Sequence, residues 1–110
     1  MRPHDTHSGA YPLALELVTE SESLAIRLRD KHRDLADRLM DASISLALDI
    51  AAGEYVVAYC SACLAAATLD LALSVRALDA EAHGRADALI GRITGVLDAL
   101  EEPLPLSELN

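Results

Sequence analysis

LADRLMDASISLALDIAAG, residues 35–53, is the stretch that decides the fold. Its apolar side chains recur at steps of four, three, four and four residues, the spacing of one face of an α-helix: Leu35, Leu39, Ala42, Leu46 and Ile50. Gly53 is a natural stop, because glycine readily adopts the left-handed conformation that commonly ends a helix. We therefore expect a helix over residues 34–52.

A first helix is expected over residues 12–30, with Pro12 opening it. Its leucines recur at helical spacing on one side: Leu13, Leu17, Leu24 and Leu28. Neither Gly nor Pro separates the two helices, so one continuous helix over residues 12–52 is an alternative. We favour a break at residues 30–33, because the apolar pattern lapses there in a charged run. A single long helix would also leave its apolar stripe without a partner in the same chain.

Two more helices are expected after Gly53. The third, over residues 54–78, is apolar around most of its circumference and therefore needs burial on more than one side. A thin polar line runs along it at seven-residue spacing: Glu54, Ser61 and Thr68. The fourth, over residues 79–101, has Asp79 as its N-cap and ends before Pro103. Its apolar residues keep a four-three heptad rhythm: Ala82, Ala86, Leu89, Ile93, Val96 and Leu100.

Four helices with short connections predict an all-α, antiparallel, up-down four-helix bundle in a single domain over residues 11–102. A chain of 110 residues has no room for a second domain. We expect residues 1–10 to be a flexible leader and residues 103–110 to be a C-terminal tail.

The protein is expected in the cytoplasm, because its polar start has no hydrophobic signal peptide and its cysteines are few. The longest charge-free stretch, residues 55–69, is shorter than the roughly 20 residues that cross a bilayer. We therefore expect no membrane partner.

The stretch 35–53 resembles the second helix of the bacterial four-helix bundle proteins encoded in intervening sequences of large-subunit ribosomal RNA genes. Relatives in that family include the accessory protein of diversity-generating retroelements. The resemblance implies a ring-like homopentamer whose basic surface holds RNA or DNA. It rests on residues in matching places: Leu35, Leu39, Ala42, Ser45, Ile50, Ala51 and Gly53.

The formal charge of −9 disfavours nucleic acid as a partner, because unspecific attraction to phosphates normally needs a basic surface. The richest cationic cluster is the candidate contact for a phosphate or an acidic partner. Asp30, Asp34 and Asp37 are interleaved with it, so we expect a solvated corner that is neutralised by short-range ion pairs. The cluster holds five of the nine basic residues: Arg27, Arg29, Lys31, Arg33 and Arg38.

Four small residues form a stripe on the last helix, away from its leucine and valine seam. Each interior glycine costs a helix about 1 kcal/mol relative to alanine. The stripe therefore indicates a groove where a helix of a neighbouring subunit comes close, although mere tolerance of weak positions explains it equally well. Its members are Gly84, Ala88, Gly91 and Gly95.

Cys60 and Cys63 have the C-x-x-C spacing of redox pairs and of half a zinc site. They lie in mid-helix without cationic neighbours, and no second ligand pair stands at a suitable spacing. We expect them to pack as small apolar groups, with thiol redox chemistry as a weaker alternative.

No catalytic, metal-binding or cofactor-binding residue is assigned. The carboxylates Glu16, Glu20, Asp49 and Asp70 come without a Glu-x-x-His pair, and the serines lack a nucleophile turn. We therefore predict a non-catalytic, homo-oligomeric scaffold or adaptor that binds another protein, pentameric if the resemblance holds. The alternative is a nucleic-acid-binding accessory factor that acts with a reverse transcriptase or on structured RNA.

Overall fold

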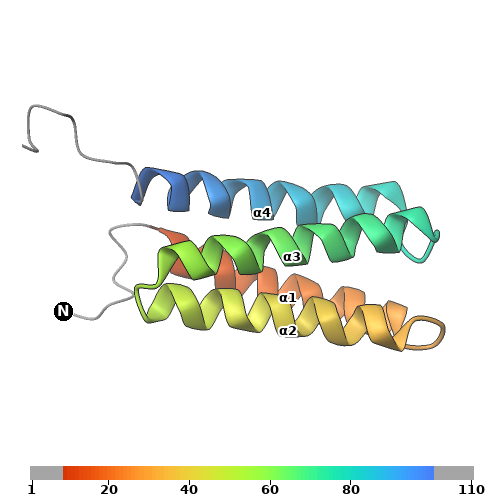
Figure 1. The fold of residues 1–110 in the computed structure, drawn as a ribbon. Coiled ribbons are helices and arrows are strands. Elements are labelled where there is room, and N and C mark those ends of the chain that lie inside the picture. Colours follow the sequence, from red (N-terminus) through yellow and green to blue (C-terminus); the bar gives the residue numbers. More distant parts are fainter. Residues whose placement is uncertain (1–8, 101–110) are drawn as a thin grey trace, which may run out of the picture.

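The computed structural model describes residues 9–100, which form four helices. Consecutive helices run in opposite directions, and each packs against two neighbours: α1 and α3 both contact α2 and α4 (Figure 1). This arrangement is an antiparallel up-down four-helix bundle, so the predicted fold class is confirmed. The helices are α1 (Ala10–Leu28), α2 (Arg33–Ala51), α3 (Tyr55–Ser74) and α4 (Ala80–Leu100).

The chain breaks between α1 and α2, so the prediction of two helices rather than one is confirmed. The amides of Arg29 and His32 still donate to α1 carbonyls, and α2 begins directly after His32. The prediction that the first helix begins at Pro12 is wrong by two residues. The first helix begins at Ala10, and Pro12 lies inside its first turn, where a backbone N–H has no acceptor within the helix.

Two helices end in the same hydrogen-bonded motif. After α2, the Gly53 amide donates to Ile50 and the Glu54 amide to Asp49. After α3, Arg76 occupies the position that Gly53 holds after α2: the Arg76 amide donates to the Leu73 carbonyl and the Ala77 amide to the Ala72 carbonyl. These are Schellman ends, in which the residue after the cap adopts a left-handed conformation. Because of this motif α3 ends at Ser74, four residues before the expected Leu78.

Large side chains from α1, α2 and α4 fill most of the core. Its fully buried large residues are Leu17, Leu24, Leu28, Leu39, Leu46, Ile50, Leu69, Ile93 and Leu97. Only Leu69 among these comes from α3, whose inner side otherwise consists of small residues. Two members of its polar line, Ser61 and Thr68, are buried there. Ser61 donates to Asp49 of α2, and Thr68 donates to the Leu64 carbonyl of its own helix.

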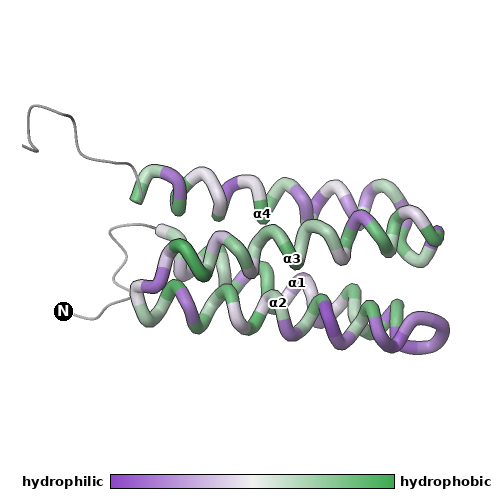
Figure 2. Tube along the Cα trace, viewed as in Figure 1, coloured by the Kyte–Doolittle hydropathy of each residue, from purple (hydrophilic) through white to green (hydrophobic). Residues whose placement is uncertain are grey.

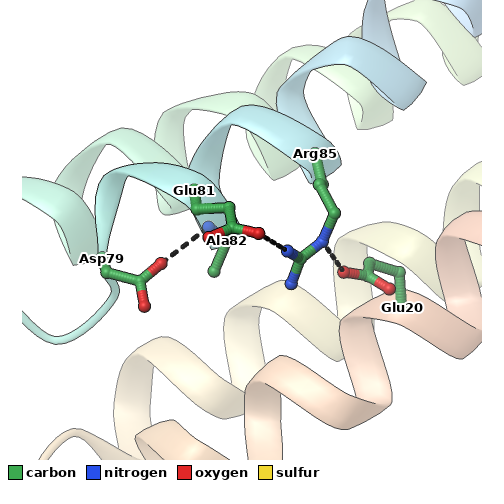
Figure 3. Close-up of polar contacts among 5 residues, drawn as sticks. All are labelled: Glu20, Asp79, Glu81, Ala82 and Arg85. Carbon is green, nitrogen blue, oxygen red and sulfur yellow. Dashed lines mark hydrogen bonds and ion pairs between the residues drawn. The ribbon is translucent and has the colours of Figure 1, made fainter.

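Asp79 caps α4 as predicted: its carboxylate accepts a hydrogen bond of 2.7 Å from the Ala82 amide (Figure 3). The predicted heptad seam is only partly confirmed, because Leu89 and Val96 are half-buried and Leu100 is exposed. A straight helix drifts by about 20° per heptad, which turns neighbouring residues toward the core instead. The residues that α4 buries are Ala82, Ala86, Ile90, Ile93 and Leu97.

The packing is uneven around the bundle. Helix α1 packs extensively against α2, whereas α4 packs less extensively against both α3 and α1. Most of the predicted leader, the predicted tail and residues 101–102 of the predicted bundle lie outside the described residues.

Candidate functional sites: an apolar face and a basic end

Helix α3 presents a broad apolar face to the outside of the bundle. No charged residue occurs in α3 except Asp70, and the helix is hydrophobic along most of its length in Figure 2. Apart from Leu69, the residues of α3 that face inward are small, and most of its larger apolar side chains face outward. We call this surface the α3 face, and its exposed members are Val56, Val57, Cys60, Cys63, Leu64, Ala67, Leu71 and Val75.

The prediction that Cys60 and Cys63 pack in the core is wrong, because both are exposed on the α3 face. The side of α3 that faces the core is instead occupied mainly by small residues, such as the fully buried Ala62 and Ala65. The hydropathy of α3 is nearly uniform around the helix, so hydropathy alone did not indicate which side would face inward.

Within the described part of the chain, α3 is the one helix whose length and composition would allow it to cross a bilayer. In the described structure, however, this helix packs against other helices of the bundle. Its inner side packs against α2 and α4, and its Ser61 is hydrogen-bonded to a carboxylate of α2.

The turns between α1 and α2 and between α3 and α4 lie at the same end of the bundle (Figure 1). The α1–α2 turn is strongly hydrophilic in Figure 2. Both turns line one hollow of about 340 Å³, to which Arg27 and Lys31 come from the first turn region and Arg76 from the second. We call this cationic region the basic end: Arg27, Arg29, Lys31, Arg33 and Arg76.

The expected neutralisation of the cationic cluster holds for Arg38 alone, which pairs with Asp34 at 3.0 Å. Within residues 9–100, the other four cations of the predicted cluster form no ion pair, and neither does Arg76. Sequence reasoning missed Arg76, because it is 43 positions away from Arg33. Only the antiparallel topology brings the two turns together.

The small-residue stripe of Gly84, Ala88, Gly91 and Gly95 is exposed on the outside of α4. No neighbouring atom would lie within 4 Å of a Cβ added at any of its three glycines. A close approach of another helix of the same chain is therefore absent along the described stripe. Its contact with a neighbouring subunit stays a prediction.

Three of the four carboxylates considered for catalysis belong to separate local networks, and Glu16 forms no ion pair within the described residues. Glu20 lies 3.6 Å from Arg85, which also pairs with Glu81 (Figure 3). Asp49 accepts from Ser61, while Asp70 contacts His83. The structure thus places these carboxylates on three different helices with different partners.

One group of side chains has the composition of a metal site that the sequence analysis did not assign. Asp70 and His83 are 2.8 Å apart, and the ligand atoms of Asp70, His83 and Asp87 all lie within 4.8 Å of one another. Imidazole and carboxylate groups are common ligands of divalent ions. Both carboxylates are exposed, and the hydrogen bond between Asp70 and His83 ties α3 to α4.

Comparison of the chain with protein-family models, with curated proteins and with solved structures found no match.

Proposed function

We propose that this chain is a non-catalytic scaffold or adaptor whose copies assemble by docking through the α3 face. The exposed apolar row on α3 is the observation that carries the proposal. Leu64 and Val56 are each 63% exposed, although their side chains are fully apolar. A contiguous apolar surface on a soluble protein commonly marks an interface.

A second copy of the chain is the partner that the charges favour. Two molecules of net charge −9 repel each other wherever their acidic surfaces meet. The α3 face limits this repulsion, because none of its members is charged and Asp70 is the only charged residue of the helix.

The size of the α3 face also suits self-association. Its eight exposed members extend along α3 and one residue beyond it. A specific interface at the lower end of the usual range buries about 600 Å² on each copy. A twofold dimer would use the α3 face on both copies, whereas a ring needs a second, different patch. Ile44 and Leu48 of α2 are exposed apolar residues that offer such a patch for the pentamer implied by the resemblance.

Light scattering at micromolar concentration tests the assembly. We expect a mass that is a multiple of 11.7 kDa for the unmodified protein. Leu64→Lys should give a folded monomer, because a charge in the docked face would be buried without a partner. Ile26→Lys is the matched control, since Ile26 is 60% exposed on α1 and lies outside the α3 face.

Leu48→Lys then distinguishes the two forms of assembly: it should leave a twofold dimer intact and break a ring. Circular dichroism must show that every variant keeps its helices. An unmodified protein that is monomeric at micromolar concentration would overturn the proposal, as would a Leu64→Lys variant that stays assembled.

A nucleic-acid-binding accessory factor, acting with a reverse transcriptase or on structured RNA, is the second candidate function. The unpaired cations of the basic end favour it, because assembly by symmetry would gather several such ends. Binding of RNA or DNA should then weaken steeply as salt is raised. Absence of any binding at low salt would end this candidate.

A further inference from the structure

The hollow at the basic end is formed by three separate segments of the chain. Arg27 belongs to the last turn of α1, Lys31 and His32 belong to the α1–α2 turn, and Arg76 belongs to the α3–α4 turn. We call it the end hollow; its volume is about 340 Å³, and its lining is Arg27, Asp30, Lys31, His32, Val75, Arg76 and Ala77. It lies at the end of the bundle and shares one residue, Val75, with the α3 face.

Positive charge dominates this hollow although the whole chain is strongly acidic. Arg27, Lys31 and Arg76 face a single carboxylate, that of Asp30, together with the imidazole of His32. None of the three cations forms an ion pair within residues 9–100. Outside the hollow, Arg38 and Arg85 are paired with carboxylates, whereas Arg29, Arg33 and Arg92 form no ion pair within the described residues. The hollow thus retains free cationic groups that an anion can use.

The start of α2 adds to this positive potential. His32 is the N-cap of α2 and lines the hollow, yet no side chain caps the helix there. The amides of the first helical turn therefore lack a side-chain acceptor, and the positive end of the helix dipole lies beside the three cations.

Arg76 lines the hollow from a backbone position that suits glycine. Its φ of 61° is left-handed, and it is the one non-glycine residue of the described chain with a positive φ. Gly53 holds the equivalent position after α2, with a φ of 78°. A side chain disfavours this conformation, because its Cβ approaches the following carbonyl oxygen. Arg76 therefore occupies a position where glycine would fit the backbone better. Unlike glycine, it places a guanidinium group in the lining of the hollow.

We propose that the end hollow binds the phosphate groups of a small polyphosphate, such as inorganic pyrophosphate or the phosphates of a nucleotide. Arginine guanidinium groups bind phosphate oxygens with two parallel hydrogen bonds, and lysine adds a compact positive charge. A bounded hollow with three cations suits a compact anion, whereas an extended nucleic-acid backbone needs a longer row of cations. This binding does not depend on assembly through the α3 face.

Titration calorimetry with inorganic pyrophosphate at low salt, on the full chain, tests the proposal. Arg76→Gly should weaken binding by about tenfold or more, as expected for the loss of a charge-assisted contact. The same substitution should leave the midpoint of urea unfolding unchanged or raise it, because glycine relieves the left-handed backbone. Loss of binding therefore cannot be attributed to unfolding. Arg92→Gln, on α4 and outside the hollow, should bind pyrophosphate as the unmodified protein does.

Competition with ATP and with a short single-stranded RNA separates the sources of phosphate. ATP should displace pyrophosphate, while RNA should compete more weakly per phosphate. No pyrophosphate binding at millimolar concentration would overturn the proposal, and so would an Arg76→Gly variant of unchanged affinity. RNA that binds more tightly than either small ligand would assign the hollow to nucleic acid instead.

Discussion

Two serines connect α1 and α2 inside the core. Ser21 and Ser43 are both fully buried, and their hydroxyl oxygens are 2.7 Å apart. The proton of Ser43 is donated to the Leu39 carbonyl, 2.8 Å away, so the proton between the two hydroxyls must come from Ser21. Ser43 thus has the Leu39 carbonyl as its own acceptor, whereas the Ser21 hydroxyl depends on Ser43. A buried hydroxyl without a partner is costly.

This pair gives a prediction for stability. Ser43→Ala should lower the free energy of unfolding by about 1 to 2 kcal/mol, because the Ser21 hydroxyl loses its acceptor in the core. Replacing both serines by alanine should cost less than Ser43→Ala alone, since no buried hydroxyl is left unpaired. Urea unfolding at a fixed protein concentration measures both values. Equal losses in the two proteins would show that Ser21 finds another acceptor.

Single residues also show what the sequence could and could not reveal. Asp79 was identifiable as a cap, because an acidic residue directly before a helix has few other roles. The role of Arg76 could not be identified in the same way. Its left-handed conformation depends on how α3 ends, and its place in the same hollow as Lys31 depends on which turns lie at the same end of the bundle. Arginine has a high helix propensity, so the residue type at position 76 favoured continuation of α3.

For helix α3, the sequence predicted the excess of apolar surface but not which side of the helix faces the core. Its apolar circumference correctly indicated a helix with more hydrophobic surface than its neighbours cover. Its orientation was unpredictable, because both sides are apolar and only side-chain size separates them. The small Ala62 and Ala65 are buried against the core, while Leu64 and the cysteines lie on the outer side.

The exposed thiols report directly on the α3 face. Cys60 and Cys63 should react quickly with an aromatic disulfide reagent in a monomeric Leu64→Lys variant. They should react at least about tenfold more slowly in the assembled protein, because docking would exclude the reagent. Ile26→Lys should behave like the unmodified protein. Equal rates in all three proteins would place the interface away from these cysteines.

At the scale of the whole molecule, the up-down topology followed from the four helical patterns and the short connections between them. The distribution of charge between the two ends of the bundle could not be predicted in this way, although the sequence shows every charged residue. The antiparallel arrangement gathers Arg27, Lys31 and Arg76 at one end. The opposite end receives Asp49, in the last turn of α2, and Glu54, in the α2–α3 turn.

The uneven packing of α4 implies that the bundle does not open uniformly. Gly84, Gly91 and Gly95 each weaken the helix by about 1 kcal/mol relative to alanine, and α4 also makes the least extensive contacts with its neighbours. Amide hydrogens of α4 should therefore exchange with deuterium faster than those of α2, as peptide mass spectrometry can measure. Faster exchange in α2 would contradict this order. The detachment of α4 would be the first sub-global step of unfolding, leaving a three-helix remnant built on the α1–α2 hairpin.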